Sequence, residues 1–74
     1  MVSNLEYYKT FYYVAKTGSL TQAASLLSIS QPAVSQALKQ LEQQTNAKLV
    51  RRVSKGVKLT AEGELLYSYV AKGY

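Results

Sequence analysis

The first third of the chain repeats apolar residues every three or four positions, which is the spacing of one helix face. Residues 4–16 carry such a stripe and are predicted to form an amphipathic helix that ends at Thr17-Gly18. The same spacing returns over residues 20–27 and predicts a second helix of about two turns. Ser19 is its expected N-cap, and Gln22 follows three residues later, where it can complete a capping box.

A third helix is predicted over residues 31–44, with Ser30 as its N-cap and Pro32 in its first turn. Only residues 28–30 separate it from the second helix. Two helices joined by so short a turn are typical of a helix–turn–helix unit. Five positions of this unit are expected to be buried: Ala23, Leu27, Ile29, Val34 and Ala37.

Past the third helix, β-branched residues and a glycine change the pattern. Residues 49–53 and 57–59 are predicted to be short strands joined by the three-residue turn 54–56. A fourth helix is expected over residues 61–74, capped by Thr60. The predicted fold is therefore mainly α: a winged helix–turn–helix with a three-helix core, a two-stranded β wing and a C-terminal helix.

The 74 residues suffice for one small domain and include neither cysteine nor histidine. All four acidic residues are glutamates, so aspartate is missing as well. The chain thus lacks the common general bases, metal ligands and catalytic triads, and we expect no enzymatic activity, no metal and no cofactor. No apolar run could span a bilayer and the first residues differ from a secretory signal, which favours a cytoplasmic protein without a membrane partner.

Positive charge is concentrated in one segment. The chain has a net charge of +5, and residues 48–60 alone contain five Lys or Arg and no acid. Such a patch attracts a polyanion, although a lone run of charge is more often only a solvated surface. The outward face of the predicted third helix favours a polyanion, because short amide and hydroxyl side chains suit contact with base edges. This face consists of Gln31, Pro32, Ser35, Gln36, Lys39, Glu42 and Gln43.

Together these features predict sequence-specific binding of double-stranded DNA for the regulation of transcription. Recognition helix 31–44 would enter the major groove, and the basic wing, residues 48–59, would reach the backbone or minor groove. The alternative is a winged-helix protein-interaction module that does not read DNA, because an acidic protein could satisfy the same charges. Membrane-surface binding is disfavoured, since the cations lie on a predicted hairpin and not on one face of an amphipathic helix.

The predicted fourth helix exposes an apolar stripe that so short a chain cannot cover by itself. Residues 1–60 would then form the DNA-binding domain, and residues 61–74 would begin a dimerisation helix that pairs with a second copy. Such a homodimer would recognise a partly palindromic operator. The stripe consists of Leu65, Leu66, Tyr69 and Val70. Of the other tyrosines, we expect Tyr8 and Tyr12 on the core side of the first helix, Tyr7 and Tyr13 at the surface, and Tyr67 and Tyr74 against the partner helix.

Two sets of residues recur at the spacing of a known family. In the helical part these are Phe11, Val14-Ala15, Gly18 to Thr21, Ala23-Ala24, Leu27, Ser30 to Gln36, Leu38 and Leu41-Glu42. Further on they are Leu49, Arg51, Val57, Leu59-Thr60, Glu62 and Gly63. In these residues, over nearly its whole length, the chain closely resembles the N-terminal domain of LysR-type transcriptional regulators.

The resemblance implies a bacterial repressor or activator that binds DNA as a dimer, through a winged helix and a long linker helix. The positions it implies for the major groove are Gln31, Pro32, Ser35, Gln36 and Lys39. Phosphate contacts are implied at Ser19 and Thr21, and backbone or minor-groove contacts of the wing at Arg51, Arg52 and Lys55. Lys39 is expected to meet phosphate rather than a base. Arg52 is favoured over Arg51, because neighbours on a strand point to opposite faces.

The chain departs from the family pattern at two positions. Gln36 stands where the family often has Arg, so a base preference cannot be carried over, and Val50 stands where an aromatic residue is common. Family members also contain a long C-terminal domain that binds a small effector. We therefore expect no effector site in these residues, and the resemblance implies a bacterial cytoplasmic protein that associates with the nucleoid through DNA.

Overall fold

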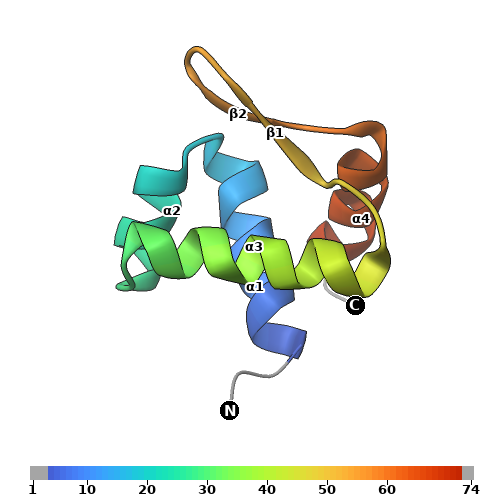
Figure 1. Ribbon diagram of the computed structural model, residues 1–74, viewed down its shortest axis with the longest axis horizontal. Coiled ribbons are helices and arrows are strands. Elements are labelled where there is room, and N and C mark those ends of the chain that lie inside the picture. Colours follow the sequence, from blue (N-terminus) through green and yellow to red (C-terminus); the bar gives the residue numbers. More distant parts are fainter. Residues whose placement is uncertain (1–3, 73–74) are drawn as a thin grey trace.

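The computed structural model describes residues 4–72 and has four helices and one hairpin (Figure 1). In chain order the elements are α1 (Asn4–Thr17), α2 (Leu20–Leu27), α3 (Gln31–Thr45), β1 (Val50–Val53), β2 (Gly56–Leu59) and α4 (Ala61–Ala71). Helix α3 lies across α1, with α2 near its start, while the antiparallel hairpin rises beside the helices and leads into α4. The winged helix–turn–helix expected from the sequence is confirmed, and the first three predicted helices match to within one residue. Helix α4 ends at Ala71, short of the predicted end at residue 74, and residues 73–74 lie outside the described residues.

The three predicted helix caps are present. The side-chain oxygens of Ser19, Ser30 and Thr60 each accept a hydrogen bond from the backbone N–H three residues later, at 3.1, 3.2 and 3.0 Å. Ser28 ends α2 in the left-handed conformation with φ 58°. Each cap satisfies a donor that the first turn of a helix leaves free, and the left-handed residue stops α2 after two turns, so both boundaries of the short turn are set locally.

The core is formed where α1 meets the other helices and the start of the wing. Its largest fully buried side chains are Phe11, Leu41, Leu49, Val14 and Val34. Of the five positions predicted to be buried in the helix–turn–helix, two are buried and two are half-buried, but Ile29 is 40 % exposed and that prediction is wrong. The Ile29 N–H bonds the Ala24 carbonyl at 3.1 Å, so the turn is fixed through its backbone while its side chain remains at the surface.

The wing hairpin is tighter than predicted. Its turn contains only residues 54–55, and Gly56 is the first residue of β2, paired with Val53. Gly56 has φ +126°, and a Cβ at this position would lie 2.3 Å from the Gly18 carbonyl oxygen. The neighbouring Val57 N–H donates to that same oxygen at 3.0 Å. The glycine is therefore required where the wing crosses the end of α1, and not only by the turn.

Helix α4 packs against α1 and β2 within the same chain. Leu66 and Tyr67 are half-buried against the core, and the Tyr67 ring stacks on Tyr12 with a centroid distance of 5.7 Å. Tyr67 therefore packs against α1 of its own chain, and its contact with a partner helix stays a prediction. Leu65 and Tyr69 are 61 % and 62 % exposed, so part of the predicted apolar stripe does face outward.

Two tyrosines of α1 were expected at the surface but are partly buried. Tyr7 and Tyr13 both pack against the core. Helices α2, α3 and α4 and strand β2 all contact α1, and this leaves little of its circumference open to solvent. Tyr74 lies outside the described residues.

Candidate nucleic-acid interface

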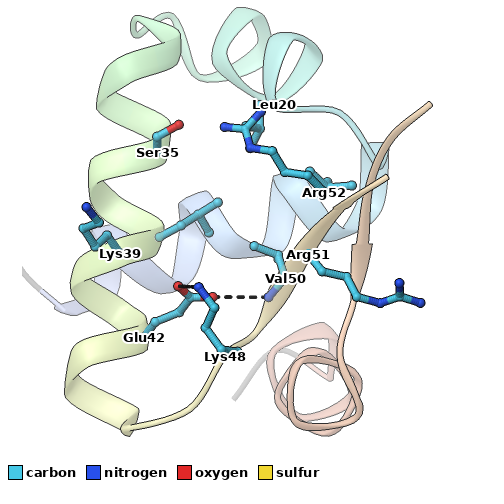
Figure 2. Close-up of a pocket in the computed structure, with 10 residues that line it drawn as sticks. Leu20, Ser35, Lys39, Glu42, Lys48, Val50, Arg51 and Arg52 are labelled. Carbon is cyan, nitrogen blue, oxygen red and sulfur yellow. Dashed lines mark hydrogen bonds and ion pairs between the residues drawn. The ribbon is translucent and has the colours of Figure 1, made fainter. Parts of the chain in front are cut away.

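A groove of about 410 Å³ separates α3 from the wing (Figure 2). We call it the wing groove. Helices α2 and α3 and both strands of the wing contribute to its walls. The residues that line it are Leu20, Ser35, Leu38, Lys39, Glu42, Lys48, Val50, Arg51, Arg52 and Val57. Four of these ten residues are cationic and one is acidic, although the Arg51 side chain extends away from the groove, so the groove is a positively charged depression beside the outer face of α3.

The outer face of α3 holds the base-edge candidates, and they divide into two directions. Gln31, Pro32 and Gln36 are exposed, whereas Ser35 is half-buried. Figure 2 shows Ser35 directed from α3 toward β1, while Lys39 extends from the outer side of the helix. Gln36 instead borders a hollow between α3 and the first half of α1. Ser35 and Gln36 therefore lie on opposite flanks of the exposed face.

The phosphate candidates of α2 lie close to the start of α3. Thr21 is exposed, and its hydroxyl is 3.5 Å from the side-chain oxygen of Gln31. The Ser19 hydroxyl already caps α2 by accepting from the Gln22 N–H, which satisfies one donor of that helix end. The structure thus brings the beginning of α2 beside the beginning of α3.

The two neighbouring arginines of β1 point in opposite directions, as strand alternation predicts. In Figure 2, Arg52 extends into the wing groove toward α2, and Arg51 extends away on the other side of the strand. Arg52 is paired with Val57 and Arg51 with Lys58 on β2. Lys55 is exposed in the turn between the strands. The three cations therefore occupy different positions on the wing: Arg52 lies at the wall of the groove, Arg51 on the opposite face, and Lys55 at the tip.

Glu42 has a structural role that the sequence pattern missed. It was predicted on the outward face of the third helix, but its side chain is only 15 % exposed. Its Oε2 accepts hydrogen bonds from the backbone N–H groups of Leu49 and Val50, at 2.8 and 3.3 Å, and its Oε1 is 3.7 Å from Lys48 Nζ. These partners follow Glu42 by six to eight residues and lie beyond the end of α3, where the chain turns back beside the helix. Helical periodicity predicts contacts only within the helix, so it could not reveal them.

Within residues 4–72, no three His, Cys, Asp or Glu side chains gather as a metal site requires. No helix of the described chain has both the length and the apolar character needed to cross a membrane.

Residues 5–64 match the family described as bacterial regulatory helix-turn-helix proteins of the lysR family. The chain belongs to the LysR family. It is 43 % identical over 68 residues to the HTH-type transcriptional regulator BudR of Klebsiella aerogenes, covering 92 % of this chain and 48 % of BudR. The chain therefore spans about half the length of that relative.

Solved structures of the family agree with this assignment. The DNA-binding domain of BenM in complex with catB site 1 DNA has a TM-score of 0.87 and 37 % identity, over 92 % of this chain and 76 % of that one. DarR of Vibrio fischeri in complex with DNA has a TM-score of 0.85 and 33 % identity, over 97 % of this chain and 24 % of DarR. As a member of the LysR family, the chain is a helix–turn–helix domain similar to those of transcription regulators.

Proposed function

We propose that this chain binds double-stranded DNA with α3 in the major groove and the wing on the backbone or minor groove. The observation that carries the proposal is the wing groove itself, which places cationic side chains from α3 and β1 beside the polar outer face of α3. Phosphates would be attracted to the cations, while base edges would meet the amides and hydroxyls of the helix. The relatives solved with DNA, BenM and DarR, support the same use of this fold.

The position of each side chain determines whether it would contact a base edge or a phosphate. The proposed base-edge contacts are Gln31, Pro32, Ser35 and Gln36. The proposed phosphate and wing contacts are Ser19, Thr21, Lys39, Arg51, Arg52 and Lys55. Arg52 is the strongest wing candidate because it extends into the wing groove, where a DNA strand passing between α3 and the wing would lie.

A second copy would complete the regulator. Leu65 and Tyr69 are exposed on α4, and Leu66, Tyr69 and Val70 line an apolar hollow together with Tyr8 of α1. Because a water-exposed apolar face of this kind favours association, we propose a homodimer through residues 61–74, with residues 1–60 as the DNA-binding domain. A two-fold related pair of domains would recognise a partly palindromic operator, in the cytoplasm on chromosomal DNA.

A salt series tests the electrostatic part of the proposal. Fluorescence anisotropy would measure the affinity for a mixed-sequence duplex from low to high salt for the wild type, Arg52→Ala and Lys9→Ala. Each phosphate contact adds about 0.9 to the slope of log affinity against log salt, so Arg52→Ala should lower the slope by about that amount. Lys9 is exposed on α1 outside the wing groove, so its variant should keep the wild-type slope. Salt-independent or absent binding of the wild type would refute the proposal.

A further inference from the structure

The wing groove contains a carboxylate where DNA binding would favour none. Among the residues that line it in the described chain, Glu42 is the only acid, beside Lys39, Lys48 and Arg52. A carboxylate in a phosphate-binding groove repels the ligand and offsets part of the attraction of a nearby cation. Because Glu42 weakens the attraction of the wing groove for phosphate, we expect its contacts to provide a structural role that compensates for this loss.

The contacts of Glu42 supply that role. One carboxylate oxygen accepts two consecutive backbone N–H groups at the start of the wing, from Leu49 and Val50, and the other oxygen faces the Lys48 ammonium. Hydrogen bonds to an ionised acceptor are about twice as strong as neutral ones. With its side chain only 15 % exposed, the carboxylate is directed at these groups and is largely shielded from solvent.

The segment that Glu42 holds is fixed from a second side by α4. The Leu49 carbonyl accepts from the Thr60 N–H at 3.1 Å, and the Thr60 hydroxyl donates to the Lys48 carbonyl. The Leu49 side chain is buried in the core, 2 % exposed. The start of the wing is therefore held between α3 and α4, and on the α3 side Glu42 makes the polar connection.

We propose that Glu42 is the positioning residue of the wing: it sets the distance between recognition helix and β1, so that Arg52 and Ser35 face the same groove. This inference rests on the proposed function. Arg52 follows Val50 by two residues on one short strand, and so a displacement of the strand's beginning displaces the arginine with it. Glu42 thus increases the affinity for DNA although its own charge opposes binding.

The test is Glu42→Gln, with Glu62→Gln as the matched control. Both changes remove one negative charge, but Glu62 is exposed in the first turn of α4 and away from the wing groove. Loss of the charge alone should leave the affinity for DNA equal or higher, which is the result expected for the control. Glu42→Gln should instead bind a mixed-sequence duplex about eightfold more weakly at 0.1 M salt, because one lost phosphate contact lowers the slope by about 0.9 over the tenfold range to 1 M.

A double-mutant cycle with Arg52→Ala separates positioning from general stability. In the wild type, Arg52→Ala should cost about eightfold in affinity at 0.1 M salt. In the Glu42→Gln background it should cost less than about twofold, because the arginine no longer reaches its phosphate. Thermal melts followed by circular dichroism would give the melting midpoint of each variant, and all affinities would be measured at a temperature well below the lowest midpoint. Glu42→Asp keeps the charge but shortens the reach, and it should also lower the salt slope.

The possible outcomes distinguish the inference from the proposed function. Wild-type binding with an unchanged slope in Glu42→Gln and Glu42→Asp would overturn the inference alone. The same holds if Arg52→Ala costs the full eightfold in both backgrounds. If Arg52→Ala has no effect in the wild type, the inference fails together with the Arg52 contact of the proposed function. If the wild type itself shows no salt-dependent binding, the proposed function fails and the inference fails with it.

Discussion

Replacing Gly63 by alanine should separate α4 from the start of the wing. Gly63 is buried in the first turn of α4, and a Cβ built on it would lie 2.0 Å from the Leu49 carbonyl oxygen and 2.9 Å from its carbon. Both groups are backbone and cannot rotate away. The helix must therefore retreat by about 1 Å, and this also strains the hydrogen bond from the Thr60 N–H to the same oxygen.

Three effects set the size of the loss. Overpacking at a fixed contact costs about 1–3 kcal/mol, and weakening one backbone hydrogen bond costs about 0.5–1.5 kcal/mol. Alanine is the better helix former by about 1 kcal/mol and offsets part of this. The net destabilisation is about 2 kcal/mol, which for a domain of this size lowers the melting midpoint by about 8–16 °C.

Thermal unfolding followed by circular dichroism measures this shift, with a urea titration to obtain the free energy. Ser68→Ala is the control, because Ser68 is exposed on the same helix and its replacement changes helix propensity without a new contact. The control should melt at or slightly above the wild type. If Gly63→Ala melted as high as the control, the close approach of α4 to Leu49 would be refuted.

Three further changes test other parts of the account. Leu41→Ala should destabilise the domain by about 2–5 kcal/mol in urea titrations, because it empties part of the fully buried core; a loss below 1 kcal/mol would contradict that placement. Ser30→Ala should cost about 1 kcal/mol in the same assay through loss of the α3 cap, and no loss would argue against the hydroxyl–Ala33 bond. The double variant Leu65→Glu/Tyr69→Glu should shift the protein toward monomer in sedimentation velocity. The melting midpoint of the monomer should stay within a few degrees of the wild type, since both side chains are exposed. An unchanged mass distribution would count against the proposed dimer face.

Features governed by neighbours in sequence could be predicted from the chain alone. Helix periodicity and the caps at Ser19, Ser30 and Thr60 depend on contacts within one turn, and the structure confirms them. The opposite directions of Arg51 and Arg52 likewise follow from strand geometry. In the candidate site, the polar face of α3 and the basic wing could therefore be predicted from the sequence, and so could the family.

Features that depend on distant parts of the chain were missed. Glu42 has the spacing of a helix-surface residue, but its partners come from the chain that returns beside α3. Gly56 was assigned to the turn, whereas the approach of the wing to Gly18 determines its position. The stacking of Tyr67 on Tyr12 is not predicted either, because no local pattern reveals that α1 lies against α4. In each case the contact is tertiary and leaves no periodic signal.

The most direct test of the central claim is whether α3 reads base sequence. The wild-type domain would select its preferred duplex from a random library, and anisotropy would then give its affinity for the selected and mixed-sequence duplexes. Gln31→Ala/Ser35→Ala should bind the selected duplex about tenfold or more weakly, since each base contact contributes about 1–3 kcal/mol of discrimination, while its binding to the mixed duplex stays unchanged. Failure to enrich any duplex, or full retention of the preference by the helix variant, would contradict the assignment of α3 as the recognition helix.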